Sequence, residues 1–327
     1  MPSDGIDYVF SVRNISRGAF GTRVGASSFL AVPTRDAAGT PVTVADPASH
    51  RIAKRDWFAR VQAAAVSDHI DGEPVGDVVV YVHGYNTSQQ TMLTRQRKLR
   101  DGLAAHGFGG VVVGFDWPSA DRTLNYLGDR KDAKASALRL VDEGIAAFAA
   151  RQRQDCRINV HILAHSMGCY VVREAFDDAD DRPAVAAASW TVSQVMLVAA
   201  DVSAASLAAG NPKSSSLYRH SVRLTNYFNP HDGVLSLSNM KRVGVAPRAG
   251  RIGLPDGHPD AAVNVYCGTR FLSQRDGTGG GHSAPHSWYF DDAEFMRDVF
   301  LTVQGTLDRH EFPTRAPTDR HNLGLLP

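Results

Sequence analysis

The sequence has few cysteines, no long hydrophobic run and almost no net charge. Cys156, Cys169 and Cys267 are too few and too scattered for a disulfide framework, and none belongs to a CxxC pair. The first residues contain neither a basic start followed by an apolar core nor a small-residue cleavage site, and no stretch approaches about 18 uninterrupted apolar residues. These absences predict an unexported, cytoplasmic protein without a membrane span.

The charges are balanced, which limits the partners that the protein can attract. Its 327 residues include 35 Lys and Arg against 34 Asp and Glu, a formal net charge of +1. No excess of positive charge favours a nucleic acid or an anionic membrane as partner, and 43% apolar residues are typical of a globular chain. We therefore expect a small-molecule or oligomeric substrate, no nucleic acid and no membrane, and the sequence is compatible with a homo-oligomer.

The stretch RINVHILAHSMGCY, residues 157–170, combines an apolar run with an abrupt polar stop and a second apolar pattern. The first pattern predicts a buried strand and the second a helix packed on a sheet. A nucleophilic serine on such a turn must stand clear of the sheet, and the small residues Ala164 and Gly168 on either side let strand and helix approach. Ser166 is therefore the predicted nucleophile, in an A-x-S-x-G variant of the G-x-S-x-G elbow.

Other apolar runs predict strands that alternate with helices along the chain. Strands are expected at residues 8–12, 28–32, 77–82, 110–115, 195–200, 222–228 and 262–266, and helices at residues 51–66, 89–106, 131–153 and 295–302. This alternation predicts the α/β class, with a mostly parallel sheet and helices on both faces, and the elbow at Ser166 is of the kind found in the α/β-hydrolase fold. In such sheets the site lies beyond the carboxyl ends of the strands.

We expect a single domain over residues 1–327. It divides into N-terminal strands and a helix (1–76), a catalytic core (77–305) and a tail (306–327). The tail is rich in Pro and Arg after Phe312, and we expect it to be poorly ordered or draped on the surface.

A serine nucleophile needs a carboxylate and a histidine, which follow it in that order in this fold. Asp232 is the preferred acid because the turn NPHDG would hold its carboxylate rigidly after the strand at residues 222–228. Asp201, at the end of the preceding strand, is the alternative acid, or else caps the segment behind it.

Thirteen histidines make the base harder to choose, and position in the chain narrows the field. His286 is preferred because the aromatic residues behind it can anchor its loop while the glycines ahead let it reach the serine. His282 is the alternative. No HExxH motif or paired Cys/His spacing occurs, so we expect no metal and no other cofactor.

The oxyanion hole needs two N–H donors near the serine. The backbone of Met167 follows the nucleophile directly, and the backbone of Tyr85 follows Gly84 in the loop after the strand at residues 77–82. The candidates for substrate contact are the aromatic and imidazole side chains of Trp117, Tyr126 and His165, with the loop around residues 207–218. Within that segment, residues 211–216 are expected to form a polar loop. For His165, a structural hydrogen bond that shapes its turn is the alternative.

The motifs VYVHGYNTS, FDWPSA, YLGDRKDA, HILAHSMG and HSWYF together resemble the alpha/beta hydrolases grouped as domain of unknown function 900. The resemblance runs from about residue 78 to residue 289. It implies an α/β-hydrolase fold with Ser166 as nucleophile and His286 in a His-Ser-aromatic motif. The chain departs from the family in a longer Gly-rich insertion before His286, which contains His282.

These residues predict a serine esterase. Ser166 would attack an ester carbonyl, His286 would move the proton and Asp232 would orient His286, through an acyl-enzyme intermediate. An amidase, thioesterase or acyltransferase would use the same apparatus, and a binding protein that keeps only the hydrolase scaffold is the alternative outside enzymes.

Overall fold

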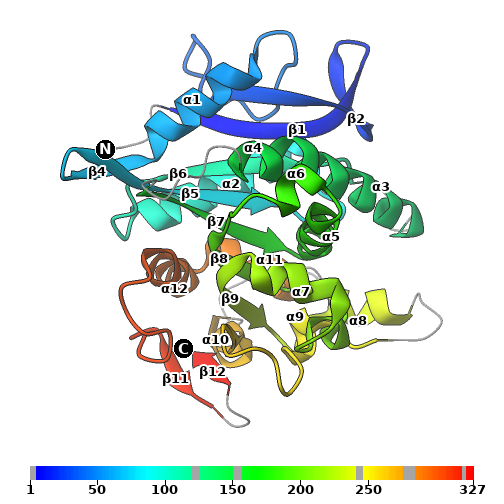
Figure 1. The fold of residues 1–327 in the computed structure, drawn as a ribbon, viewed down its shortest axis with the longest axis vertical. Helices are drawn as coiled ribbons and strands as arrows, with labels where there is room; N and C mark the ends of the chain where they lie inside the picture. The colour runs from blue at the N-terminus through cyan, green and yellow to red at the C-terminus, as the bar shows by residue number, and fades with distance from the viewer. Residues whose placement is uncertain (1–4, 120–125, 150–156, 241–245, 275–283, 319–321) are drawn as a thin grey trace.

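One mixed sheet runs through the molecule, from the N-terminal hairpin at one end to the C-terminal strands at the other (Figure 1). The computed structural model describes residues 5–119, 126–149, 157–240, 246–274, 284–318 and 322–327. Within these ranges the strands are β1 (Ile6–Ser16), β2 (Ala19–Pro33), β3 (Arg51–Ile52), β4 (Val66–Ile70), β5 (Glu73–Val82), β6 (Val111–Asp116), β7 (Arg157–His165), β8 (Val192–Val198), β9 (Ser221–Phe228), β10 (Ala262–Tyr266), β11 (Arg315–Pro317) and β12 (Leu323–Leu325). Their order is β11-β12-β10-β9-β8-β7-β5-β6-β1-β2-β3, with β4 paired to β5.

The centre of the sheet is parallel. Neighbours from β1 through β6, β5, β7, β8, β9 and β10 to β12 all pair in parallel, and the antiparallel pairs are β1–β2, β2–β3, β4–β5 and β11–β12. Val82 is level with Ala164, and His165 is level with Val198. The carboxyl ends of β5, β7 and β8 therefore meet at one edge, where sites form in such sheets.

Helices cover both faces of the sheet, which confirms the predicted α/β class. They are α1 (Lys54–Ala65), α2 (Gln89–Ala104), α3 (Tyr126–Arg139), the π-helix η1 (Leu140–Ile145), α4 (Ala146–Ala149), α5 (Gly168–Asp180), α6 (Pro183–Ala186), η2 (Ala204–Leu207), α7 (Pro212–Arg219), α8 (Gly233–Met240), α9 (Ala249–Ile252), α10 (Gly268–Gln274), α11 (Ala284–Ser287), η4 (Trp288–Asp291) and α12 (Ala293–Gln304). No helix in the described ranges is long and apolar enough to cross a bilayer.

Alternate residues of the central strands pack into two separate cores. On β5, Val78 and Val82 pack with side chains of α1 and α5, whereas Val79 and Tyr81 pack with side chains of α2 and α12. Burial on both faces explains why these strands are continuous apolar runs in the sequence.

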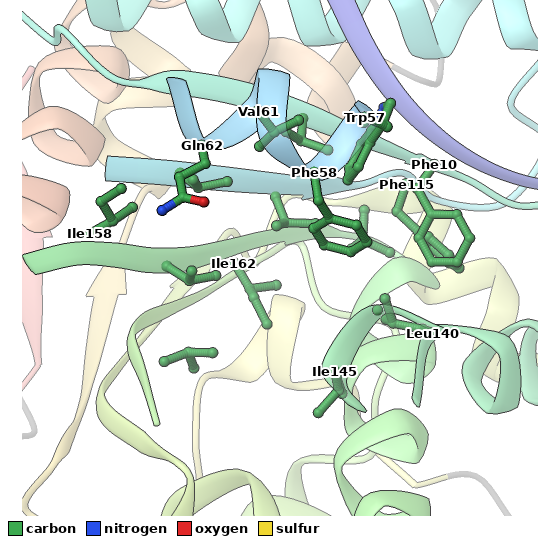
Figure 2. A pocket seen from close by; sticks show the side chains of 18 of the residues that line it. Phe10, Trp57, Phe58, Val61, Gln62, Phe115, Leu140, Ile145, Ile158 and Ile162 are labelled. Carbon is green, nitrogen blue, oxygen red and sulfur yellow. The ribbon is translucent and has the colours of Figure 1, made fainter. Parts of the chain in front are cut away.

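An apolar cavity of about 180 Å³ lies against the first of these faces, beside α1 and η1 (Figure 2). Much of its floor consists of alternate residues of β5 and β7, namely Val78, Val80, Val82, Ile158, Val160 and Ile162. No titratable side chain is among the described residues that line it. The cavity therefore lacks the groups that acid-base or nucleophilic chemistry needs.

The predicted polar loop at residues 211–216 is wrong, because α7 begins there. The side chain of Asn211 accepts a hydrogen bond from the Lys213 N–H, and Pro212 occupies the first turn. An Asn cap followed by Pro is a typical helix start.

The prediction of a loosely attached tail is also wrong. β12 pairs with β10 in the main sheet, and the Arg315 guanidinium binds the Asp298 carboxylate of α12 with an Nη2–Oδ1 distance of 2.6 Å. Both side chains are fully buried, and Tyr227 and Thr314 also donate hydrogen bonds to Asp298. The C-terminal strands are therefore anchored in the core.

We expect Arg315→Met to lower the free energy of unfolding by about 3–5 kcal/mol, because it leaves the Asp298 carboxylate buried without its cation. The matched control is Arg297→Met on the same helix as Asp298. Arg297 is half-exposed and pairs with Glu294, so its loss should cost below about 1 kcal/mol. Urea unfolding of the two variants measures the difference, and equal losses would contradict the anchoring role.

Candidate active site

Ser166 lies on a sharp turn between β7 and α5, as the sequence predicts. Its φ is +56°, in the left-handed region that non-glycine residues seldom adopt. Its N–H donates to the Val198 carbonyl at 2.9 Å, and its own carbonyl accepts from the Asp201 N–H at 3.1 Å. These bonds to the end of β8 and to the segment directly after it hold a conformation that costs of order 1–3 kcal/mol, as is typical of a nucleophile elbow.

Two glycines let the backbone close around this turn. A Cβ atom on Gly168 would lie 2.4 Å from the Val82 carbonyl oxygen, and one on Gly84 would lie 2.7 Å from the Ser166 Cβ. Neither position has room for a methyl group, so the loop after β5 packs directly against the serine.

The structure brings His286 and Asp232 together. The His286 Nδ1 lies 2.6 Å from the Asp232 Oδ2, and the carboxylate is fully buried. The other carboxylate oxygen accepts the N–H groups of Val234 and Leu235 in the first turn of α8. Because Nδ1 faces a carboxylate, it carries the proton, and Nε2 is left as the basic nitrogen of the imidazole.

His165 links this pair to the serine turn. Its Nε2 donates to the His286 carbonyl at 2.8 Å, and the two rings lie 4.8 Å apart. Burial first, and then the nearby His286, hold the pKa of His165 well below its ordinary value, so the ring is neutral. The prediction of a substrate contact is wrong for His165: the side chain is 1% exposed and tethers the segment that carries His286.

Asp201, the alternative acid, forms an ion pair with Arg248. Its carboxylate lies 2.9 Å from the Nε of Arg248, and both side chains are 4% exposed. The structure therefore pairs His286 with Asp232 and leaves the alternative acid in a buried ion pair.

Trp117 was expected to contact substrate, and this prediction is wrong because its side chain is fully buried. Its indole stacks on the His83 ring at 5.4 Å and donates to the His83 carbonyl at 2.8 Å. The His83 Nδ1 donates to the Gly84 carbonyl, and its Nε2 accepts the Trp117 N–H. His83 and Trp117 therefore hold the start of the loop after β5 in place. The Tyr126 side chain and His282 lie outside the described residues.

Two predicted N–H donors flank the serine. Met167 is the residue directly before α5, and the N–H groups of Cys169 and Tyr170 in the first turn donate to the Ser166 and Met167 carbonyls. Tyr85 follows Gly84, which contacts the serine directly, and the loop ends where the Ser88 side chain caps α2. Backbone N–H groups at a helix start and in a tight loop are suited to an anion. No group of three potential metal ligands occurs among the described residues.

With this geometry established, comparison with known proteins identifies the class. The family model described as "Alpha/beta hydrolase of unknown function (DUF900)" matches residues 59–259, more than half of the chain. The chain belongs to this family of α/β hydrolases, which confirms the resemblance seen in its motifs.

The individual relatives are distant. The uncharacterized protein alr1448 of Nostoc sp. (strain PCC 7120 / SAG 25.82 / UTEX 2576) is 29% identical over 122 residues, and the match covers 31% of each chain, about a third of that relative's length. A cutinase-like protein from Cryptococcus sp. is 15% identical, with 68% of this chain and 90% of that one covered and a TM-score of 0.35. Carboxyl esterase 2 from Tuber melanosporum is 10% identical, with 93% and 86% covered and a TM-score of 0.36.

We expect Gly84→Ala to lower the free energy of unfolding by about 1–3 kcal/mol, because the new methyl group overlaps the Ser166 Cβ. The control is Gly233→Ala, next to Asp232, where a Cβ meets nothing within 4 Å and stability should change by below about 1 kcal/mol. Urea unfolding compares them, and an equally tolerated Gly84→Ala would show that the loop does not pack on the serine.

Proposed function

We propose that this α/β hydrolase cleaves carboxylic esters through an acyl-enzyme intermediate on Ser166. The observation that carries the proposal is the 2.6 Å bond between His286 Nδ1 and the buried Asp232 carboxylate, tied through His165 to the serine turn. A hydroxyl is a weak nucleophile at neutral pH, and an imidazole oriented by a carboxylate is the usual means of activating it.

In the first half of the reaction, the basic Nε2 of His286 takes the proton of the Ser166 hydroxyl as Oγ attacks the ester carbonyl. The negative charge that develops on the carbonyl oxygen is stabilised by the N–H groups of Met167 and Tyr85. The tetrahedral intermediate then collapses, the C–O bond to the alcohol breaks, and His286 delivers its proton to the leaving alkoxide.

In the second half, His286 takes a proton from water as the water oxygen attacks the acyl carbonyl. The second tetrahedral intermediate then collapses, the bond between the acyl carbon and Ser166 Oγ breaks, and His286 returns the proton to Oγ as the acid leaves. Asp232 stabilises the imidazolium that forms twice in each cycle. Its carboxylate does not have to move, because the Val234 and Leu235 N–H groups already hold Oδ1 in place. Preorganisation of this kind avoids reorganisation during the reaction.

The experiment is hydrolysis of p-nitrophenyl esters from acetate to palmitate. We expect Ser166→Ala and His286→Ala to lower kcat by roughly 10⁴-fold or more. Asp232→Asn should lower kcat by about 10⁴-fold, because its Oδ1 can still cap α8 while its amide favours the wrong imidazole tautomer. A Ser166→Ala protein as fast as wild type would refute the mechanism.

Asp201→Asn is the matched acid control. It removes a carboxylate near the serine turn that pairs with Arg248, so it should reduce stability while kcat at a temperature well below unfolding stays near that of wild type. Loss of kcat in folded Asp201→Asn, with full activity in Asp232→Asn, would reverse the acid assignment. Matched p-nitroanilides distinguish an esterase from an amidase.

A further inference from the structure

A buried ion pair connects β1 to the end of β6. Arg13 lies on β1 and Asp116 ends β6, and the Arg13 Nε is 2.7 Å from the Asp116 Oδ1. The side chains are 5% and 0% exposed. The family model matches residues 59–259, so β1 lies outside the matched region. Arg13 therefore places a cation in the core from a strand that precedes this region.

The same guanidinium also binds the loop. The Arg13 Nη2 donates to the Thr87 carbonyl at 3.1 Å. The Thr87 backbone is also held by Ser119, whose hydroxyl lies 3.0 Å from the Thr87 N and 3.1 Å from its carbonyl oxygen. Thr87 is two residues beyond Tyr85, the predicted oxyanion donor, so the position of this peptide limits where the Tyr85 N–H can point.

The Asp116 carboxylate is fixed by further donors. Its Oδ2 accepts the Ser11 hydroxyl at 2.9 Å and the Gln89 amide at 3.2 Å. With two acceptor oxygens and three donors, the carboxylate has little freedom to rotate, and the guanidinium bound to it is fixed as well. These bonds therefore fix the guanidinium that holds the Thr87 carbonyl in the loop at residues 83–88.

We propose that Arg13 is a positioning residue for the oxyanion hole, which presets the loop after β5 by bridging Asp116 and the Thr87 carbonyl. The inference rests on the proposed function, since it assigns a role in the same reaction. A donor that is already aimed at the developing oxyanion strengthens binding in the transition state more than in the ground state, and such a contribution appears in kcat and not in KM.

The guanidinium is suited to this role because its Nε and Nη2 are held in one plane and donate to two acceptors at once. A lysine at the same position keeps the charge beside Asp116 but is a compact point charge without the planar fork. Arg13→Lys therefore removes the hydrogen bond to the Thr87 carbonyl and keeps a positive charge beside Asp116. Ser11→Ala is the matched control, because it removes the hydroxyl that donates to Asp116 and accepts the Arg13 backbone N–H at 3.4 Å, and it leaves both contacts of the Arg13 guanidinium in place.

The experiment measures kcat and KM for p-nitrophenyl acetate, and inhibition by an alkyl boronic acid as a tetrahedral analogue, for wild type, Arg13→Lys, Ser11→Ala and Ser166→Ala. Removal of a whole oxyanion donor costs roughly 10²–10³-fold in kcat, so a loosened one should cost roughly 10- to 100-fold. We expect Arg13→Lys to lose that much kcat, with KM within about twofold of wild type and boronate affinity reduced in proportion. Ser11→Ala should stay within about threefold of wild type in kcat.

An Arg13→Lys enzyme with the kcat of Ser11→Ala, or with a raised KM and unchanged kcat, would overturn the inference. If Arg13→Lys does not fold, Asp116→Asn replaces it with the same expected pattern, because it weakens the anchor of the guanidinium. Ser166→Ala separates the two proposals. If Ser166→Ala is inactive and Arg13→Lys is normal, only the positioning role fails, whereas an active Ser166→Ala refutes the proposed function itself.

Discussion

The structure depends on one backbone constraint, the left-handed turn at Ser166. A φ of +56° is unfavourable for a serine, and the backbone hydrogen bonds of Ser166 to Val198 and Asp201 stabilise it. The turn forms only where two parallel strands end level with each other and where glycines at positions 84 and 168 allow backbone contact. The sheet, the elbow and the loop after β5 are therefore coupled through this one peptide.

Around the turn, polar groups from distant parts of the chain are buried in pairs. His286 binds Asp232, Asp201 binds Arg248, and Asp116 binds Arg13. A buried charge without a partner would be strongly unfavourable, so each pair fixes the position of the backbone that carries it. The pair of His286 and Asp232 combines a titratable base with a hydrogen bond through His165 to the serine turn, and the proposed chemistry is assigned to it for that reason.

Much of this arrangement could be predicted from local signals in the sequence. The apolar run before Ser166 and the helix pattern behind it define the elbow, and strand alternation gives the parallel sheet. The juxtaposition of Asp232 and His286 agrees with the order of acid and base expected for this fold. The start of α7 was predictable as well, since Asn211 and Pro212 form a standard helix start that the polar composition obscured.

Other features depend on contacts that no local pattern encodes. Trp117 ends a strand at the site edge, as the sequence indicates, but its ring is buried on His83, 34 residues earlier in the chain. Arg13 and Asp116 are 103 residues apart, and only the pairing of β1 with β6 brings them together. The buried pair of Arg315 and Asp298 likewise gives the tail a place that its Pro- and Arg-rich composition argues against.

The central claim is that Ser166 is an activated nucleophile, and the most direct measurement is covalent labelling. Wild-type protein is incubated with a fluorophosphonate, digested and analysed by mass spectrometry, beside His286→Ala. We expect one rapid phosphonyl adduct on the peptide containing Ser166, and labelling slowed by orders of magnitude in His286→Ala. No adduct on Ser166, or equally fast labelling in both proteins, would contradict it.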